Sequence, residues 1–167
     1  MTFSLRAATA SAGVALLSTL VPATIATANV PDKTFEFPAG IACAFPLRID
    51  AFGLQPVNKT FDAIPNGVRF LAAGKGSDLV LTNESTGKTL TLKGNGSVQW
   101  TRIDANGTAR ITTTGHNVNI YFPTDVPAGP STTLIVGRED IAVDLATGTF
   151  TRLSRTGVTT DLCAALS

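Results

Sequence analysis

The chain has 167 residues, 44% of them hydrophobic and 15% charged, and its 13 Lys and Arg residues nearly balance 12 Asp and Glu residues. This length fits one domain that buries a sizeable core. The basic residues are scattered, so neither nucleic acid nor an anionic membrane is an expected partner, because both attract a strongly basic surface.

The first 28 residues have the pattern of a secretory signal peptide. Arg6 supplies a positive charge, an apolar stretch follows, and Ala26-Thr27-Ala28 forms a signal peptidase site before Asn29. The rival interpretation is a membrane span of about 20 residues, but Pro22 and several small polar residues interrupt the stretch. We therefore predict a secreted, extracellular protein with no membrane contact after cleavage.

After residues 1–28, we predict an N-terminal arm over residues 29–40 and a single β-sandwich domain over residues 41–167. The domain is a series of short runs in which apolar residues alternate, the period of a half-buried strand, with Gly-containing turns between them. The runs expected to form strands are Phe45–Phe52, Val57–Ile64, Val68–Ala72, Leu79–Thr82, Thr89–Lys93, Val98–Ile103, Ala109–Thr114, Val118–Phe122, Thr132–Val136, Ile141–Leu145 and Thr149–Leu153.

The strand pattern predicts an all-β fold of two antiparallel sheets packed as a sandwich, Ig-like or Greek-key, with a closed barrel as the alternative. The Pro-rich stretch Pro123–Pro130 favours the sandwich, because it is too long for a hairpin turn and suits a Greek-key connection between sheets. The segment Asp161–Leu166 is expected to form one helical turn, with its aspartate as the N-cap.

The two cysteines, Cys43 and Cys163, are expected to form one disulfide, as is usual in a secreted chain. The bond would join the first structured segment to the last few residues, and the chain-entropy model assigns such a long loop about 4–5 kcal/mol. Two cysteines and one histidine do not complete a standard zinc site.

Few residues suggest catalysis or metal binding. His116 is the single histidine, at a position where local hydrogen bonding is commoner than a role as base or ligand. Asp104-Ala105-Asn106-Gly107 resembles the start of a calcium loop but lacks the later acidic ligands, so a hairpin turn explains it. Glu139 and Asp140 are adjacent carboxylates, which a strand places on opposite faces. We therefore predict no catalytic residue, no metal and no cofactor.

The best candidate for a binding surface is one face of the segment Asn117–Phe122. If Val118 and its alternate neighbours face the core, then Asn117, Asn119 and Tyr121 share the opposite face. An exposed aromatic ring beside amides is typical of sugar binding, whereas the competing interpretation is a solvated strand face with an ordinary cross-strand tyrosine. Trp100 has the same parity as Val98 and is expected in the core.

Several segments together resemble a set of small secreted proteins from high-GC Gram-positive bacteria. The resemblance covers most of the chain after residue 28. It implies secretion and a bacterial source, but it brings no activity and no site residue. The segments that carry it are Leu81-Thr82-Asn83, Thr86-Gly87-Lys88, Thr114-Gly115-His116, Phe122–Thr133, Gly137-Arg138 and Asp161–Leu166.

These observations favour a secreted, non-enzymatic β-sandwich that binds, or associates with, a partner such as a cell-surface glycan or protein. The first alternative is a carbohydrate-binding module that uses Tyr121, Asn119 and Asn117. The second is a hydrolase with two carboxylates, which would need a cleft in which their pKa values are raised.

Overall fold

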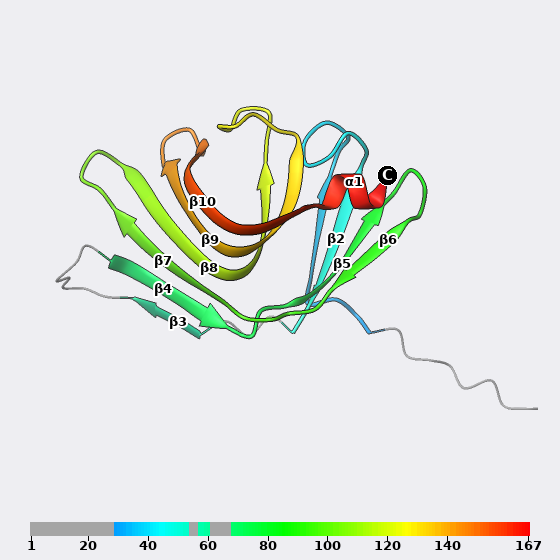
Figure 1. Cartoon of the computed structure of the whole chain (residues 1–167), viewed down its shortest axis with the longest axis horizontal. Coiled ribbons are helices and arrows are strands. Elements are labelled where there is room, and N and C mark those ends of the chain that lie inside the picture. Colours follow the sequence, from blue (N-terminus) through cyan, green and yellow to red (C-terminus); the bar gives the residue numbers. More distant parts are fainter. Residues whose placement is uncertain (1–28, 54–56, 61–67) are drawn as a thin grey trace, which may run out of the picture.

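The computed structural model describes residues 29–53, 57–60 and 68–167, and it contains two antiparallel β-sheets and one short helix (Figure 1). The predicted signal segment, residues 1–28, and the last part of the expected strand Val57–Ile64 lie outside the described residues. The elements are β1 (Lys33–Phe37), β2 (Leu47–Phe52), β3 (Val57–Thr60), β4 (Val68–Gly74), β5 (Asp78–Asn83), β6 (Thr89–Leu92), β7 (Ser97–Ile103), β8 (Thr108–Tyr121), β9 (Ser131–Asp144), β10 (Phe150–Asp161) and α1 (Leu162–Leu166).

The two sheets confirm the predicted sandwich, and they do not close into a barrel. Sheet A has four strands in the order β1-β2-β5-β6, and sheet B has six in the order β10-β9-β8-β7-β4-β3. The chain changes sheets three times, after β2, after β4 and after β6. Part of the expected N-terminal arm belongs to the sandwich, because β1 pairs with β2 at the edge of sheet A.

The Pro-rich stretch does not change sheets, so this part of the topology prediction was wrong. It joins β8 to β9, which are direct neighbours that pair from Thr108↔Asp144 to Tyr121↔Ser131. The stretch is long enough to reach the edge of β10, where Val126 forms a bridge with Thr151. The Val126 N–H donates to the Phe150 carbonyl at 2.8 Å, and the Val126 carbonyl accepts from the Arg152 N–H at 2.7 Å.

Strands β8, β9 and β10 are much longer than the runs expected from the sequence, and each one bends in its middle (Figure 1). At the bend, Gly115, Gly137 and Gly157 lie side by side in register. A Cβ atom on any of them would collide with a backbone carbonyl of the adjoining chain, that of Gly96, Thr156 or Val136 respectively. Glycine therefore permits the bend, as it does in other curved sheets.

The main core lies between sheet A and one half of the bent strands, namely the half after Gly115 in β8 and before Gly137 in β9. Its fully buried side chains include Leu47 and Leu81 from sheet A and Leu162 and Leu166 from α1, and Val118, Ile120 and Leu134 pack against them. Asp161 caps α1 as predicted, because its carboxylate accepts the Ala164 N–H at 3.0 Å.

The predicted disulfide is confirmed. It joins Cys43, just before β2, to Cys163 in α1, with the two Cα atoms 5.6 Å apart. The bond fastens α1 and the end of β10 to sheet A. Within the described ranges, no helix has the length and hydrophobicity that a membrane crossing requires.

Candidate functional site

The bend gives sheet B two different faces. Residues of odd number in β8 and β9 lie on the concave side, which we call the inner face, and residues of even number lie on the convex side, the outer face. On one side of the glycine row, the outer face packs against sheet A through Val118, Ile120 and Leu134. On the other side of the row, which includes Thr112 and Asp140, sheet A does not cover the outer face. Both faces carry polar side chains that are candidates for function.

On the inner face, a fully buried carboxylate, Glu139, is held by two residues from the other side of the bend. The Tyr121 hydroxyl donates to Glu139 Oε1 at 2.9 Å, and the Asn119 side-chain amide donates to Oε2. The strand register pairs Glu139 with Thr113, whereas it pairs Asn119 with Thr133. Because the bend folds the strands back on themselves, side chains several residues apart along β8 reach the same carboxylate.

Tyr121 is not the exposed stacking ring that its alternating position along the strand suggested. The residue is 2% exposed, and the Arg152 guanidinium lies 5.8 Å from its ring centroid. Burial raises the pKa of the Tyr121 phenol well above its usual value, and the nearby Glu139 charge adds to the shift. Tyr121 therefore acts as a permanent hydrogen-bond donor to Glu139, and it is unavailable to stack on a ligand.

The other two predicted binding residues line a recess beside the open edge of β8. Strand β7 accompanies β8 only as far as Gly115, so residues 116–121 of β8 pair with β9 alone. The recess has a volume of about 290 Å³, and Asn117, Asn119, His116 and Thr113 are in its wall. All three predicted residues are on the inner face. Asn117 and Asn119 line the recess, whereas Tyr121 is buried and bonds to the same Glu139 carboxylate as Asn119 does.

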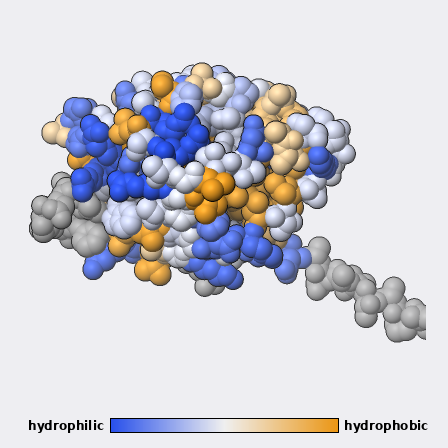
Figure 2. All heavy atoms as spheres, viewed as in Figure 1, coloured by the Kyte–Doolittle hydropathy of each residue, from blue (hydrophilic) through white to orange (hydrophobic). Residues whose placement is uncertain are grey.

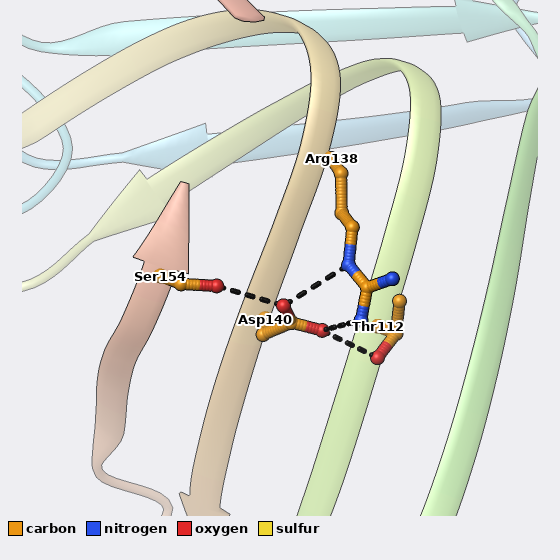
Figure 3. Close-up of polar contacts among 4 residues, drawn as sticks. All are labelled: Thr112, Arg138, Asp140 and Ser154. Carbon is orange, nitrogen blue, oxygen red and sulfur yellow. Dashed lines mark hydrogen bonds and ion pairs between the residues drawn. The ribbon is translucent and has the colours of Figure 1, made fainter. Parts of the chain in front are cut away.

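On the outer face, Asp140 is the centre of a second polar cluster (Figure 3). Arg138 binds both carboxylate oxygens, with Nη2 at 2.9 Å and Nε at 3.1 Å. The Thr112 hydroxyl of β8 donates at 2.6 Å, and the Ser154 hydroxyl of β10 donates at 2.7 Å. The Arg138 guanidinium, helped by the two hydroxyls, holds the pKa of the Asp140 carboxyl far below its usual value.

Trp100 lies on this outer face, and its expected place in the core was wrong. It pairs with Thr112, the neighbour of Asp140, and it is 36% exposed. Together with Arg102 and Arg110 it lines a shallow hollow of about 690 Å³. Val98 and Trp100 do share a face, but sheet A does not cover that face in the half of sheet B to which Trp100 belongs. In Figure 2, hydrophilic residues gather over the curved strands, and hydrophobic residues form a band near the junction of the sheets.

Two weaker sequence candidates have structural explanations. Asp104-Ala105-Asn106-Gly107 forms the hairpin turn between β7 and β8, with Asp104 paired to Arg110 at 2.8 Å. His116 lies inside β8 and its backbone N–H donates to the Gly96 carbonyl at 3.0 Å. Within the described ranges, no three His, Cys, Asp or Glu side chains gather closely enough to hold a metal ion.

The carboxylates Glu139 and Asp140 point to opposite faces of β9, as the alternation of a strand requires. They therefore do not form a catalytic pair. Where the surroundings clearly shift a carboxyl pKa in the described part of the chain, at Asp50, Asp78 and Asp140, the shift is downward. A general acid needs a shift in the other direction.

Sequence reasoning missed the outer cluster because no local pattern connects its members. Thr112, Asp140 and Ser154 come from three strands, and only the pairing of β8, β9 and β10 makes them neighbours. The single usable signal is the repeated placement of a glycine between two alternating runs, at Gly115 and Gly137, which marks two strands that bend together.

Comparison of the chain with protein-family models gives no match, and comparisons with curated proteins and with solved structures give none either.

Proposed function

We propose that this protein is a secreted, non-enzymatic binding module that holds a glycan chain on the uncovered outer face of β7–β10. The observation that carries the proposal is the exposed Trp100 in the hollow beside Arg102 and Arg110. An indole ring offers a broad apolar surface for the CH face of a sugar, and guanidinium groups donate to hydroxyl and carboxylate oxygens. In this proposal Trp100 is the residue that stacks on a sugar ring, in place of Tyr121, the candidate from the sequence.

The rigidity of the face supports this proposal. Asp140 receives hydrogen bonds from Arg138, Thr112 and Ser154, which link β8, β9 and β10 across the floor of the hollow. A surface that is already ordered loses little conformational entropy on binding. Arg110 and Arg138 each have an acidic partner, whereas Arg102 has none among the described residues. An acidic sugar in the chain would pair with Arg102.

Secretion is part of the same proposal. Its support is the signal-like pattern of residues 1–28 together with the Cys43–Cys163 disulfide, because disulfides persist in oxidising compartments. The two-carboxylate hydrolase is less well supported, since Glu139 and Asp140 face apart and the shifted carboxyl pKa values are lowered.

A glycan array probed with residues 29–167 tests the proposal. We expect binding to a subset of glycans, and we expect Trp100→Ala to weaken it at least 10-fold, as is common for a central aromatic contact. The matched control is Phe70→Ala, because Phe70 is 44% exposed and its register partner is Thr101, on the other face of the sheet. Absence of glycan binding, or binding that is insensitive to Trp100→Ala, would refute the proposal.

A further inference from the structure

The recess beside the open edge of β8 contains an unusual feature, two buried polar atoms without a partner among the described residues. These are Thr113 Oγ1 and Asn117 Nδ2, both from side chains in the wall of the recess. Thr113 is 5% exposed. Leaving such an atom unpaired is unfavourable, and most buried polar atoms in proteins have a partner. The two atoms therefore have hydrogen-bonding capacity left for a ligand.

The neighbouring inner-face network does not supply that group. Both oxygens of Glu139 already accept hydrogen bonds, from Tyr121 and from Asn119, and neither bonds to Asn117 or Thr113. Tyr121 and Glu139 instead fix Asn119 in the wall of the recess. The recess is thus lined by a rigid amide, Asn119, and by two side chains that still have hydrogen-bonding capacity.

The chemistry of the wall selects a neutral ligand with hydroxyl groups. Asn117 Nδ2 needs an acceptor, and the Thr113 hydroxyl both donates and accepts, so a ligand hydroxyl satisfies either one. Leu92 and Val118 supply apolar wall. The Lys93 ammonium at the rim is 2.7 Å from Asp78, so its charge is already compensated.

We propose that the recess binds one monosaccharide ring, or a polyol of similar size, with hydroxyl groups on Asn117 and Thr113. The volume of about 290 Å³ is at the lower end of the range of about 300–1,000 Å³ for small-molecule sites, which suits a single ring. This site is separate from the hollow around Trp100, because residues from both sheets line the recess at the start of β7, whereas the hollow lies on the outer face.

NMR titration of residues 29–167 with glucose and with N-acetylglucosamine tests the site. We expect shifts confined to the backbone amides of residues 113–119 and to the Asn117 side-chain amide. Thr113→Val, which keeps the side-chain shape, and Asn117→Leu should each weaken binding at least 5-fold. The matched control is Thr114→Val, on the same strand but facing outward, which should bind as the unchanged protein does.

A second measurement separates this proposal from a merely structural role of Thr113. Because its hydroxyl has no partner in the described part of the chain, Thr113→Val should leave the melting temperature unchanged or raise it. A clear fall in melting temperature would mean that the hydroxyl has a protein partner and would overturn the proposal. So would the absence of shifts at 113–119 with both sugars, since water alone then occupies the recess.

The proposal stands or falls independently of glycan binding on the outer face. Trp100→Ala should weaken array binding at least 10-fold but leave the shifts at 113–119 unchanged. Thr113→Val should weaken the sugar binding that causes these shifts at least 5-fold but leave array binding unchanged. If Trp100→Ala removed the shifts at 113–119, the recess would not be a separate site and this inference would fail.

Discussion

Glu139 and Asp140 are adjacent in β9, yet their environments differ completely. Glu139 is fully buried on the inner face, and its partners, Asn119 and Tyr121, come from beyond the bend of β8. Asp140 is on the outer face, and it binds Arg138 along its own strand and hydroxyls from the strands on either side. The comparison shows that strand alternation separates the two carboxylates, and that the bend supplies the partners of Glu139 while ordinary strand pairing supplies those of Asp140.

The largest effect should follow from removing the bend itself. Gly137→Ala places a Cβ atom against the Thr156 carbonyl, so the two faces lose their present geometry. We expect a loss of about 4 kcal/mol or more in the free energy of unfolding, measured by urea denaturation.

The control for this change is Gly148→Ala. Gly148 also has a positive φ, +74°, but a Cβ atom there meets nothing within 4 Å. It should cost only about 1–2 kcal/mol, the usual penalty for alanine in the left-handed region. Equal losses for the two variants would mean that the bend does not depend on close approach of the strands.

The second prediction asks whether the two faces depend on the junction between the sheets. The double change Cys43→Ser and Cys163→Ser opens the bond between sheet A and α1, and it should lower the free energy of unfolding by about 2–5 kcal/mol. The near-ultraviolet circular dichroism of Trp100 and Tyr121 should persist. Tyr121 bonds to Glu139 and Trp100 lies beside the Asp140 cluster, and the disulfide is part of neither cluster. Loss of that signal in folded protein would show that the faces are not independent.

The third prediction compares the two carboxylates directly. Tyr121→Phe leaves Glu139 Oε1 buried without this donor, and we expect a loss of about 1–3 kcal/mol in the free energy of unfolding. Thr112→Val removes a donor from Asp140, which keeps Arg138 and Ser154 and remains partly exposed to water, so it should cost less than about 1 kcal/mol. A larger loss for Thr112→Val would reverse the comparison.

The smallest effect concerns pH. The folded-state pKa of Asp140 is lowered, chiefly by Arg138, so its stabilising contribution is present above the unfolded pKa of about 3.9 and is lost as pH falls through the lower folded value. Asp140→Asn should be about 1 kcal/mol less stable than the unchanged protein at pH 7. Urea denaturation at pH 7 and at pH 3 should show that this difference shrinks in acid. A constant difference would exclude a contribution from the Asp140 charge.

The sequence was sufficient for features that depend on local chemistry. Alternating apolar residues predicted two antiparallel sheets, Asp161 was expected as a helix cap, and the two cysteines were expected to pair. Features that depend on the course of a strand were missed. Gly115 was interpreted as a turn between two short strands, whereas it is the bend within one long strand. A glycine between alternating runs has the same local pattern in both cases.

The same error explains why the candidate site was only partly predicted. The parity of Asn117, Asn119 and Tyr121 was correct, but parity does not tell which face meets solvent once a sheet curves. Tyr121 was expected to be exposed and is buried, and Trp100 was expected to be buried and is exposed. Burial at both positions depends on where sheet A ends, and the residues near either position in the sequence do not indicate that boundary.

The Pro-rich stretch between β8 and β9 has a consequence for aggregation. Strand β10 forms one edge of sheet B, and an open edge is a template on which a strand from another molecule can pair. Val126 occupies that edge at Phe150 and Arg152, and prolines at positions 123, 127 and 130 supply no N–H group to an incoming strand. Farther along, the bulge between Arg152 and Ser154 and the bend at Gly157 prevent a straight strand from following β10. The loop and the bend together therefore protect the long edge against strand-by-strand growth into fibrils.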